Sequence, residues 1–136
     1  MENKEQSHTA PGGFGPVVAQ YFTGTAWLKM LITPDGQTNC SIGDVRFEPG
    51  ARNNWHTHPG NQILIVTDGI GYYQEEGSPI RKIKVGDVIN VLPDVKHWHG
   101  ATPNSPLAHY AIGINTEKGV VDWLEPVTDE QYFSYK

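Results

Sequence analysis

Residues 50–62 read GARNNWHTHPGNQ, and residues 96–99 read KHWH. Each stretch holds two histidines separated by one residue, His56 and His58 in the first and His97 and His99 in the second. In a β-strand, residues i and i+2 point to the same face. Each pair can therefore place two imidazoles on one side of a strand, and Gln62 adds another ligand-capable side chain to the first pair. This pattern indicates one metal centre built from two strands.

The surrounding chain has the pattern of short strands separated by turns. Extended segments are expected at residues 25–32, 39–47, 62–67, 71–74, 79–85, 88–92 and 107–115. Fifteen glycines and ten prolines interrupt the chain, and turns at intervals of about 8–12 residues are typical of sandwiches and barrels. Asp68-Gly69 is expected to turn two of these strands into a hairpin. The sequence therefore predicts an all-β fold.

The two ends of the chain differ from this pattern. Residues 1–16 are polar and then rich in proline and glycine, so they are expected to form a flexible N-terminal arm. Residues 17–136 are expected to form a single domain. The only helix expected is a short one at residues 128–133, with Thr128 as its N-cap.

Composition excludes several classes of partner. The formal net charge is −5 and no basic face is visible, so nucleic acid is not an expected partner. No apolar run approaches the roughly 20 residues of a transmembrane helix, and residues 1–7 lack the apolar core of a signal peptide. Cys40 is the only cysteine. These features favour a cytoplasmic protein with no membrane partner.

The histidine segments resemble the two motifs of the cupin superfamily, whose members are small jelly-roll barrels. The first cupin motif is Gly, five residues, His-x-His, three or four residues, Glu, six residues, Gly. It is matched by Gly50, His56, His58, Gln62 and Gly69, with glutamine in place of glutamate. The resemblance implies a cupin-type jelly-roll (double-stranded β-helix) barrel with a short C-terminal helix.

The second cupin motif is matched less closely. Gly86 and His97 keep the full spacing between its glycine and its histidine. Pro93 stands one place late, Asp94 occupies the position of a glycine, and Ala101 replaces the final asparagine. Aspartate tolerates the left-handed conformation better than most residues, so the loop remains feasible.

Carried over position by position, the resemblance implies His56, His58, Gln62 and His97 as metal ligands. The chain is similar to a subgroup of single-domain bacterial cupins that includes the manganese-dependent (R)-selective hydroxynitrile lyases. That likeness extends to residues 23–27, residues 35–39, the Trp98-His99 pair and His109. It implies manganese as the cofactor and the later histidine as general base.

The ligand types support the same kind of chemistry. Three neutral imidazoles and one neutral amide leave a divalent ion fully charged, which favours a Lewis-acid role over oxygen chemistry at iron. Ligand type alone does not choose between manganese, iron, cobalt, nickel and zinc. We therefore expect one divalent transition metal.

Two further histidines are candidates for moving a proton. In an extended segment His99 faces the same cavity as His97 and could be a ligand, an acid or base, or a donor to a ligand. If His109 points inward, Ala111 and Gly113 do too, which leaves room for a small substrate. A histidine near a dication tends to stay neutral, which suits a base near pH 7.

Neighbouring residues complete the expected cavity. On residues 39–47, an inward Val45 would place Ser41, Gly43 and Phe47 along the same small, mostly apolar wall. Arg52 is expected to be a solvated surface residue, with recognition of a substrate carboxylate as the alternative. The aromatic residues near the motifs are expected to serve the core or a subunit interface.

Three functions fit these features. The first is a metal-dependent lyase or isomerase for a small oxygenated substrate, with His109 or His99 as the base and cyanohydrin cleavage as a concrete form. The second is a non-catalytic metal-containing module that binds or senses a small ligand. The third is an iron- or nickel-dependent dioxygenase. A homodimer or larger homo-oligomer is expected, because uncovered strand edges invite pairing.

Overall fold

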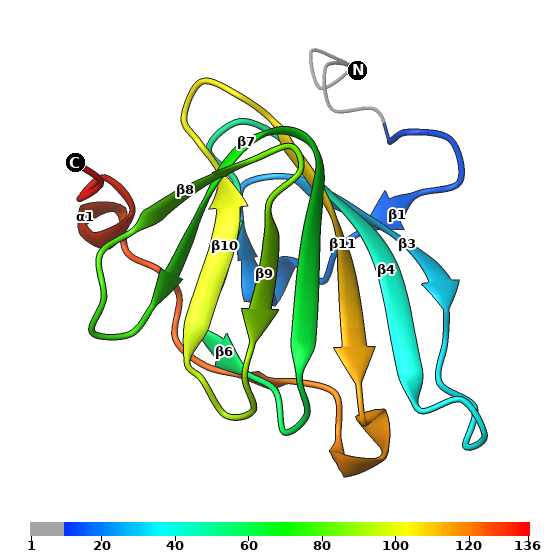
Figure 1. Cartoon of the computed structure of the whole chain (residues 1–136). Coiled ribbons are helices and arrows are strands. Elements are labelled where there is room, and N and C mark those ends of the chain that lie inside the picture. The colour runs from blue at the N-terminus through cyan, green and yellow to red at the C-terminus, as the bar shows by residue number, and fades with distance from the viewer. Residues whose placement is uncertain (1–9) are drawn as a thin grey trace.

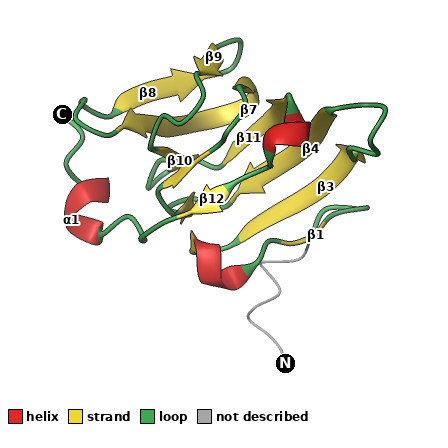
Figure 2. Ribbon diagram, turned by 90° about the horizontal axis from the view of Figure 1, so that it is seen from below, coloured by secondary structure: helices red, strands yellow, loops and turns green. Residues whose placement is uncertain are grey.

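The computed structural model describes residues 10–136, and within them it confirms the all-β jelly-roll prediction. The strands are paired antiparallel and curl into an open barrel, in which β1 and β3 form one edge and β8, which pairs only with β7, lies on the opposite side (Figures 1 and 2). The strands are β1 (Gly15–Pro16), β2 (Phe22–Thr23), β3 (Ala26–Ile32), β4 (Cys40–Phe47), β5 (Arg52–Asn53), β6 (His56–Thr57), β7 (Gln62–Glu75), β8 (Arg81–Lys84), β9 (Val88–Val91), β10 (His97–Ala101), β11 (Leu107–Ile114) and β12 (Asp122–Trp123). Two 3-10 turns, η2 (Ala19–Tyr21) and η3 (Thr116–Lys118), and helix α1 (Asp129–Tyr132) complete the fold.

Strand β7 is long enough to pair with two different sets of strands in the barrel. Its first part pairs with β9 and β11, and its second part pairs with β8 and β10. The hairpin expected at Asp68-Gly69 is wrong, because β7 continues through these residues. Gly69 has a φ of +78°, and the facing strand β11 shifts register between Ala108 and His109. A Cβ at Gly69 would collide with the Pro106 carbonyl oxygen, so glycine lets the strand bend here.

The predicted longer strands are confirmed to within about two residues, a normal margin for element boundaries. The short strands β5, β6 and β10 were missed, although β6 and β10 carry His56, His97 and His99. The described part of the predicted arm is attached to the sheet, because Gly15 and Pro16 pair with Leu28 and Trp27. Residues 1–9 of that arm lie outside the described residues.

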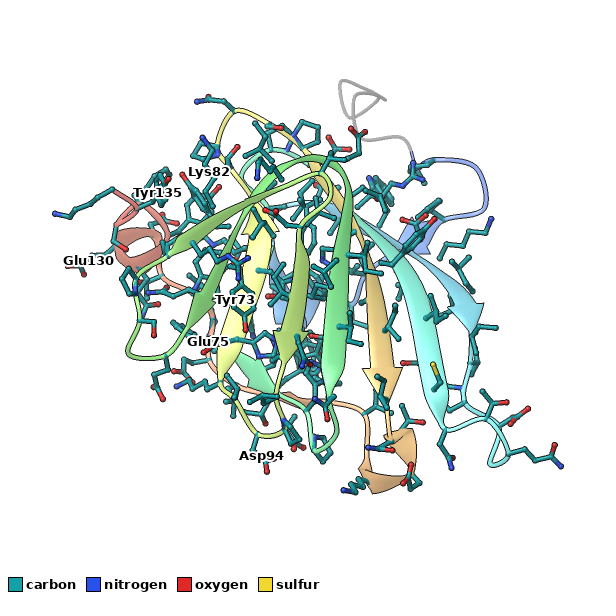
Figure 3. All side chains as sticks on the ribbon, in the orientation of Figure 1. Tyr73, Glu75, Lys82, Asp94, Glu130 and Tyr135 are labelled. Atoms are coloured by element: carbon teal, nitrogen blue, oxygen red, sulfur yellow. The ribbon has the colours of Figure 1, made fainter. Side chains whose placement is uncertain are left out.

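The turn before β10 keeps its shape despite the altered cupin motif. Asp94 has a φ of +65°, which is the left-handed conformation expected where the motif has glycine. It lies at the lower end of the barrel as drawn in Figure 3. Its backbone N–H donates to the His58 carbonyl at 2.8 Å. The turn therefore ties the second motif to the first.

Two apolar clusters stabilise the barrel. The larger cluster fills its interior with aliphatic and aromatic side chains, most of them from β3, β4, β7, β8, β9, β10 and β11. The smaller one lies under α1 and contains Trp55, Tyr72, Trp98, Val127 and Tyr132, which confirms a core role for the first three. Tyr73 belongs to the larger cluster and donates to Glu75 at 2.8 Å farther along β7 (Figure 3).

The predicted C-terminal helix is confirmed as the single turn α1. Thr128 forms a capping box with Gln131, as its N-cap role requires. The surface role expected for Arg52 is wrong: it is 5% exposed, and it donates to the Val127 carbonyl at 2.9 Å and to Asp129 at 2.7 Å. These bonds hold residues 127–129 next to β5, close to the first His-x-His segment. No helix within residues 10–136 is long and apolar enough to cross a membrane.

We expect Gly69→Ala to lower the free energy of unfolding by at least about 2 kcal/mol, since alanine there is strained and its Cβ collides with backbone. The matched control is Gly77→Ala, which has a φ of +86° but open space around its Cβ. It should cost only about 1 kcal/mol. Urea unfolding of both variants measures the difference, and equal losses would refute the close approach between β7 and Pro106.

Candidate metal centre

Strand pairing brings the two His-x-His segments together. His56 on β6 and His97 on β10 are register partners, and their ring centroids are 4.2 Å apart. The His58 ring lies 5.0 Å from that of His56 and 5.3 Å from that of His97. Gln62 begins β7, and its Oε1 lies 3.2 Å from His97 Nε2. The four residues predicted as ligands therefore converge, although their binding of a metal stays a prediction.

A hydrogen bond from Nδ1 to a backbone carbonyl group orients each of three of these histidines. Nδ1 of His56 lies 2.8 Å from the Asn54 carbonyl, that of His58 lies 2.7 Å from the Val120 carbonyl, and that of His97 lies 2.9 Å from the Val95 carbonyl. A carbonyl accepts only, so each Nδ1 carries the proton and donates it. Each Nε2 is consequently left with a free lone pair, which is the form that binds a metal.

The free lone pairs fit a cation. His58 Nε2 is buried and has no hydrogen-bond partner. His97 Nε2 and Gln62 Oε1 face one another at 3.2 Å, and both are acceptors once His97 donates through Nδ1. A buried acceptor without a donor, such as His58 Nε2, is unfavourable, and a bound cation would satisfy it. The residues present therefore suit a divalent metal ion.

A second set of possible metal ligands overlaps with this centre. His56, His97 and His99 each offer one ring nitrogen within 4.8 Å of the other two. This three-histidine cluster could hold a metal ion. His99 differs from the other two, because its Nδ1 faces His109 Nε2 at 3.0 Å and not a carbonyl group.

The two predicted proton carriers form a buried pair. His99 lies 3% exposed on β10 and His109 is fully buried on β11, with ring centroids 4.8 Å apart. His109 points inward, an orientation that the sequence alone left open. Phe47 packs against both rings, at 5.6 Å from His109 and 6.0 Å from His99. His99 therefore stands between His109 and the metal cluster.

Burial keeps the histidines of this centre neutral. It lowers the pKa of His56 and His99 well below the ordinary value of 6.5, helped in each case by neighbouring histidines. It lowers the pKa of His97 and of His109 to about 4. Desolvation is the main cause for every one of these groups, because it disfavours the charged imidazolium. A neutral imidazole can bind a metal or accept a proton.

The barrel interior is hollow beside these residues. Two adjoining parts of the cavity have volumes of about 280 and 190 Å³ and share Leu28, Val45, Ala111 and Val120 with the predicted ligands His58 and Gln62. Ser41, Gly43 and Gly113 line the smaller part, which confirms the predicted small, apolar wall. Phe47 lies behind this wall, against the His99–His109 pair. His99 lines the larger part, whereas His109 lines neither.

Sequence reasoning missed three residues of the site. Trp123 packs its ring 4.8 Å from that of His56, and Tyr21 stacks on Trp123 at 4.8 Å. Both come from segments with no strand pattern, so nothing in their spacing pointed to the metal. Asn53 also lines the cavity. Its position three residues before His56 was the only available signal.

This structure combines an antiparallel jelly-roll barrel with inward histidines from two neighbouring strands. That combination is typical of one class of metal-binding proteins. The Cupin domain family matches residues 43–113, which span both His-x-His segments. This chain belongs to the cupin family.

Three similar proteins each cover most of the chain. A curated relative, the (R)-mandelonitrile lyase of Granulicella tundricola, is 46% identical over 97% of this chain and 98% of its own length. The crystal structure of a cupin-like protein from Thermotoga maritima is 50% identical, with a TM-score of 0.84 over 86% of this chain and 89% of its own. A cupin 2 conserved barrel domain protein from Rhodopseudomonas palustris is 18% identical, with a TM-score of 0.66 over 91% of this chain and 86% of its own, and shows the fold alone.

We expect the metal-free protein to lose stability as the pH falls from 6.5 to 4. The unfolded chain protonates its histidines near pH 6.5, whereas folded His97 and His109 stay neutral until pH is about 4. The unfolded state then binds more protons, and each group destabilises the fold by up to roughly 3 kcal/mol at pH 4. Urea unfolding of chelator-treated protein across this range measures the effect. A flat profile would contradict neutral burial of these rings.

We expect His58→Ala and Gln62→Ala to lose most of their bound metal, because each removes a lone pair from the centre. The measurement is elemental mass spectrometry of tag-free protein. His109→Ala is the matched control: a buried histidine that should leave metal content unchanged. If His58→Ala keeps its metal while His99→Ala loses it, the alternative grouping with His99 holds the ion.

Proposed function

We propose that this protein is a metal-dependent lyase that cleaves a cyanohydrin into a carbonyl compound and hydrogen cyanide. The observation that carries the proposal is the 46% identity over nearly the full length with an (R)-mandelonitrile lyase. The cavity supports it, since a polar end formed by His56, His58, Gln62 and His99 meets a mostly apolar remainder. Such a cavity suits a small substrate with one polar and one apolar end.

The proposed cofactor is one manganese ion held by His56, His58, Gln62 and His97. A bound divalent ion supplies Lewis-acid stabilisation of negative charge on a substrate oxygen. The support for this ligand set is the shared orientation of the three histidines by backbone carbonyls and the unpartnered Nε2 of His58. Gln62 adds no charge, so the ion would keep its full positive charge for the substrate.

His99 and His109 would move the proton. In this proposal His99 accepts the proton of the substrate hydroxyl group, because it is neutral and lines the cavity. The carbon–oxygen bond becomes a carbonyl, the bond to the nitrile carbon breaks, and its electron pair leaves with cyanide. His99 then returns the proton to cyanide. His109, 3.0 Å behind it, would orient the His99 ring and stabilise its charged form.

We expect His99→Ala and His109→Ala to lower kcat for mandelonitrile by roughly 100-fold, the usual share of a general base and its partner. Metal content should stay near that of the parent protein in His109→Ala. The matched control is His8→Ala, which removes the histidine that precedes the described residues. The measurement is the rate of cyanide release from each variant and from the parent protein, all with the same metal content.

Three results would separate the proposed function from its alternatives. Unchanged turnover in His109→Ala would remove the histidine pair from the reaction. A loaded parent protein that binds small ligands without turning over any cyanohydrin would favour a binding module. Oxygen consumption with candidate substrates would favour a dioxygenase.

We also propose that the chain forms a homodimer or a larger homo-oligomer. The support is strand β3, where Met30, Leu31 and Ile32 are exposed by 46%, 45% and 41%. Among the described residues, β1 pairs with β3 only at Trp27 and Leu28, and an uncovered apolar edge invites pairing between copies. Light scattering of Leu31→Lys beside the parent protein tests this, because an inserted charge should shift the mass toward the monomer.

A further inference from the structure

Asn53 is a buried amide in the cavity, and it is neither one of the proposed metal ligands nor one of the two proposed proton carriers. It lies on β5, is 4% exposed, and lines the larger part of the cavity beside His56 and His99. Its register partner is Phe22 on β2. The apolar side chain of Phe22 therefore lies on one side of Asn53, and the histidines lie on the other. A buried polar group in such a place needs partners.

One hydrogen bond fixes the orientation of the Asn53 amide. The backbone N–H of His99 donates to Asn53 Oδ1 at 3.0 Å. An NH₂ group cannot accept that hydrogen, so the two ends of the amide cannot be exchanged. The Nδ2 group must therefore be the end that faces the His99 side chain.

Nδ2 is not engaged in a full hydrogen bond with that ring. It lies 3.2 Å from His99 Nε2 and 3.4 Å from His99 Nδ1. Two nearly equal distances place it over the ring face, since a donor in line with one nitrogen would lie much farther from the other. Contacts between N–H groups and aromatic faces are weak. Asn53 thus holds N–H groups in the cavity wall that lack a strong acceptor.

The cavity offers little else for a negatively charged leaving group. No lysine or arginine lines either part of it among residues 10–136. In cyanohydrin cleavage the hydroxyl proton moves to His99, and cyanide takes the electron pair of the broken carbon–carbon bond. The developing cyanide anion presents an acceptor at nitrogen, and a donor oriented before the reaction stabilises it at low cost.

We propose that Asn53 Nδ2 donates a hydrogen bond to the nitrile nitrogen and stabilises cyanide as it leaves. This assignment rests on the proposed lyase function. It makes Asn53 a residue that touches the substrate, in addition to fastening β10 through His99. The two ends of one amide then have separate roles, with Oδ1 holding the strand and Nδ2 binding the leaving group.

Asn53→Asp and Asn53→Ala separate these roles. The aspartate variant retains an oxygen for the His99 N–H but replaces the NH₂ donor with a negatively charged oxygen, whereas the alanine variant loses both ends. We expect kcat for mandelonitrile to fall about 10- to 100-fold in Asn53→Ala, the range for a hydrogen bond to a charged group. It should fall further in Asn53→Asp, while KM and metal content change little.

A binding measurement tests the donor without any turnover. Azide is a linear anion with terminal nitrogen acceptors, and its affinity for the metal-loaded protein can be measured by calorimetry. We expect azide to bind about tenfold more weakly to Asn53→Ala and more weakly still to Asn53→Asp. Urea unfolding of each variant shows whether its fold is retained.

The outcomes distinguish the two proposals. If Asn53→Asp matches the parent protein in turnover and azide affinity while Asn53→Ala is impaired, Asn53 only anchors β10 and the donor role is wrong. A parent protein that does not bind azide would also overturn it. If the parent protein cleaves no cyanohydrin, the lyase proposal fails, and the azide affinities still decide whether Asn53 is an anion donor.

Discussion

The candidate site depends on three backbone carbonyl groups that accept the Nδ1 protons of His56, His58 and His97. Each bond fixes a ring and a tautomer together, so that Nε2 is always the free nitrogen. Burial then keeps these rings neutral by lowering their pKa values. The cost is a set of desolvated lone pairs, which a bound divalent cation would relieve. In the proposed metal centre, metal binding would therefore stabilise the fold.

The C-terminal segment is needed for this arrangement. Val120 supplies the carbonyl for His58, and Trp123 packs against His56. Trp55, next to His56, exchanges backbone hydrogen bonds with Leu124 and Glu125. Arg52 holds this segment in place by bonds to the Val127 carbonyl and to Asp129, and by stacking its guanidinium on Tyr132 of α1. Residues far from the motifs in sequence thus set the shape of the centre.

The sequence was sufficient for the fold class because its signals were local. Alternation and turn residues located the longer strands, and motif spacing located the histidines. It failed at Asp68-Gly69, where the same residues that favour a hairpin also permit a bend within a continuous strand. It failed again at Arg52, whose partners Val127 and Asp129 lie more than 70 residues away and give no local pattern. Asn53 was missed for a related reason, since its importance comes from contact with His99 across two strands.

The strongest test of the metal centre is a crystal of the manganese-loaded protein measured on both sides of the manganese absorption edge. Our account predicts one anomalous peak within the barrel, bounded by Nε2 of His56, His58 and His97 and by Oε1 of Gln62. His99 should lie beside the ion and not bind it, with Nδ1 still facing His109. A peak coordinated by His99 with His58 turned away, or no peak in protein that has taken up the metal, would contradict the account.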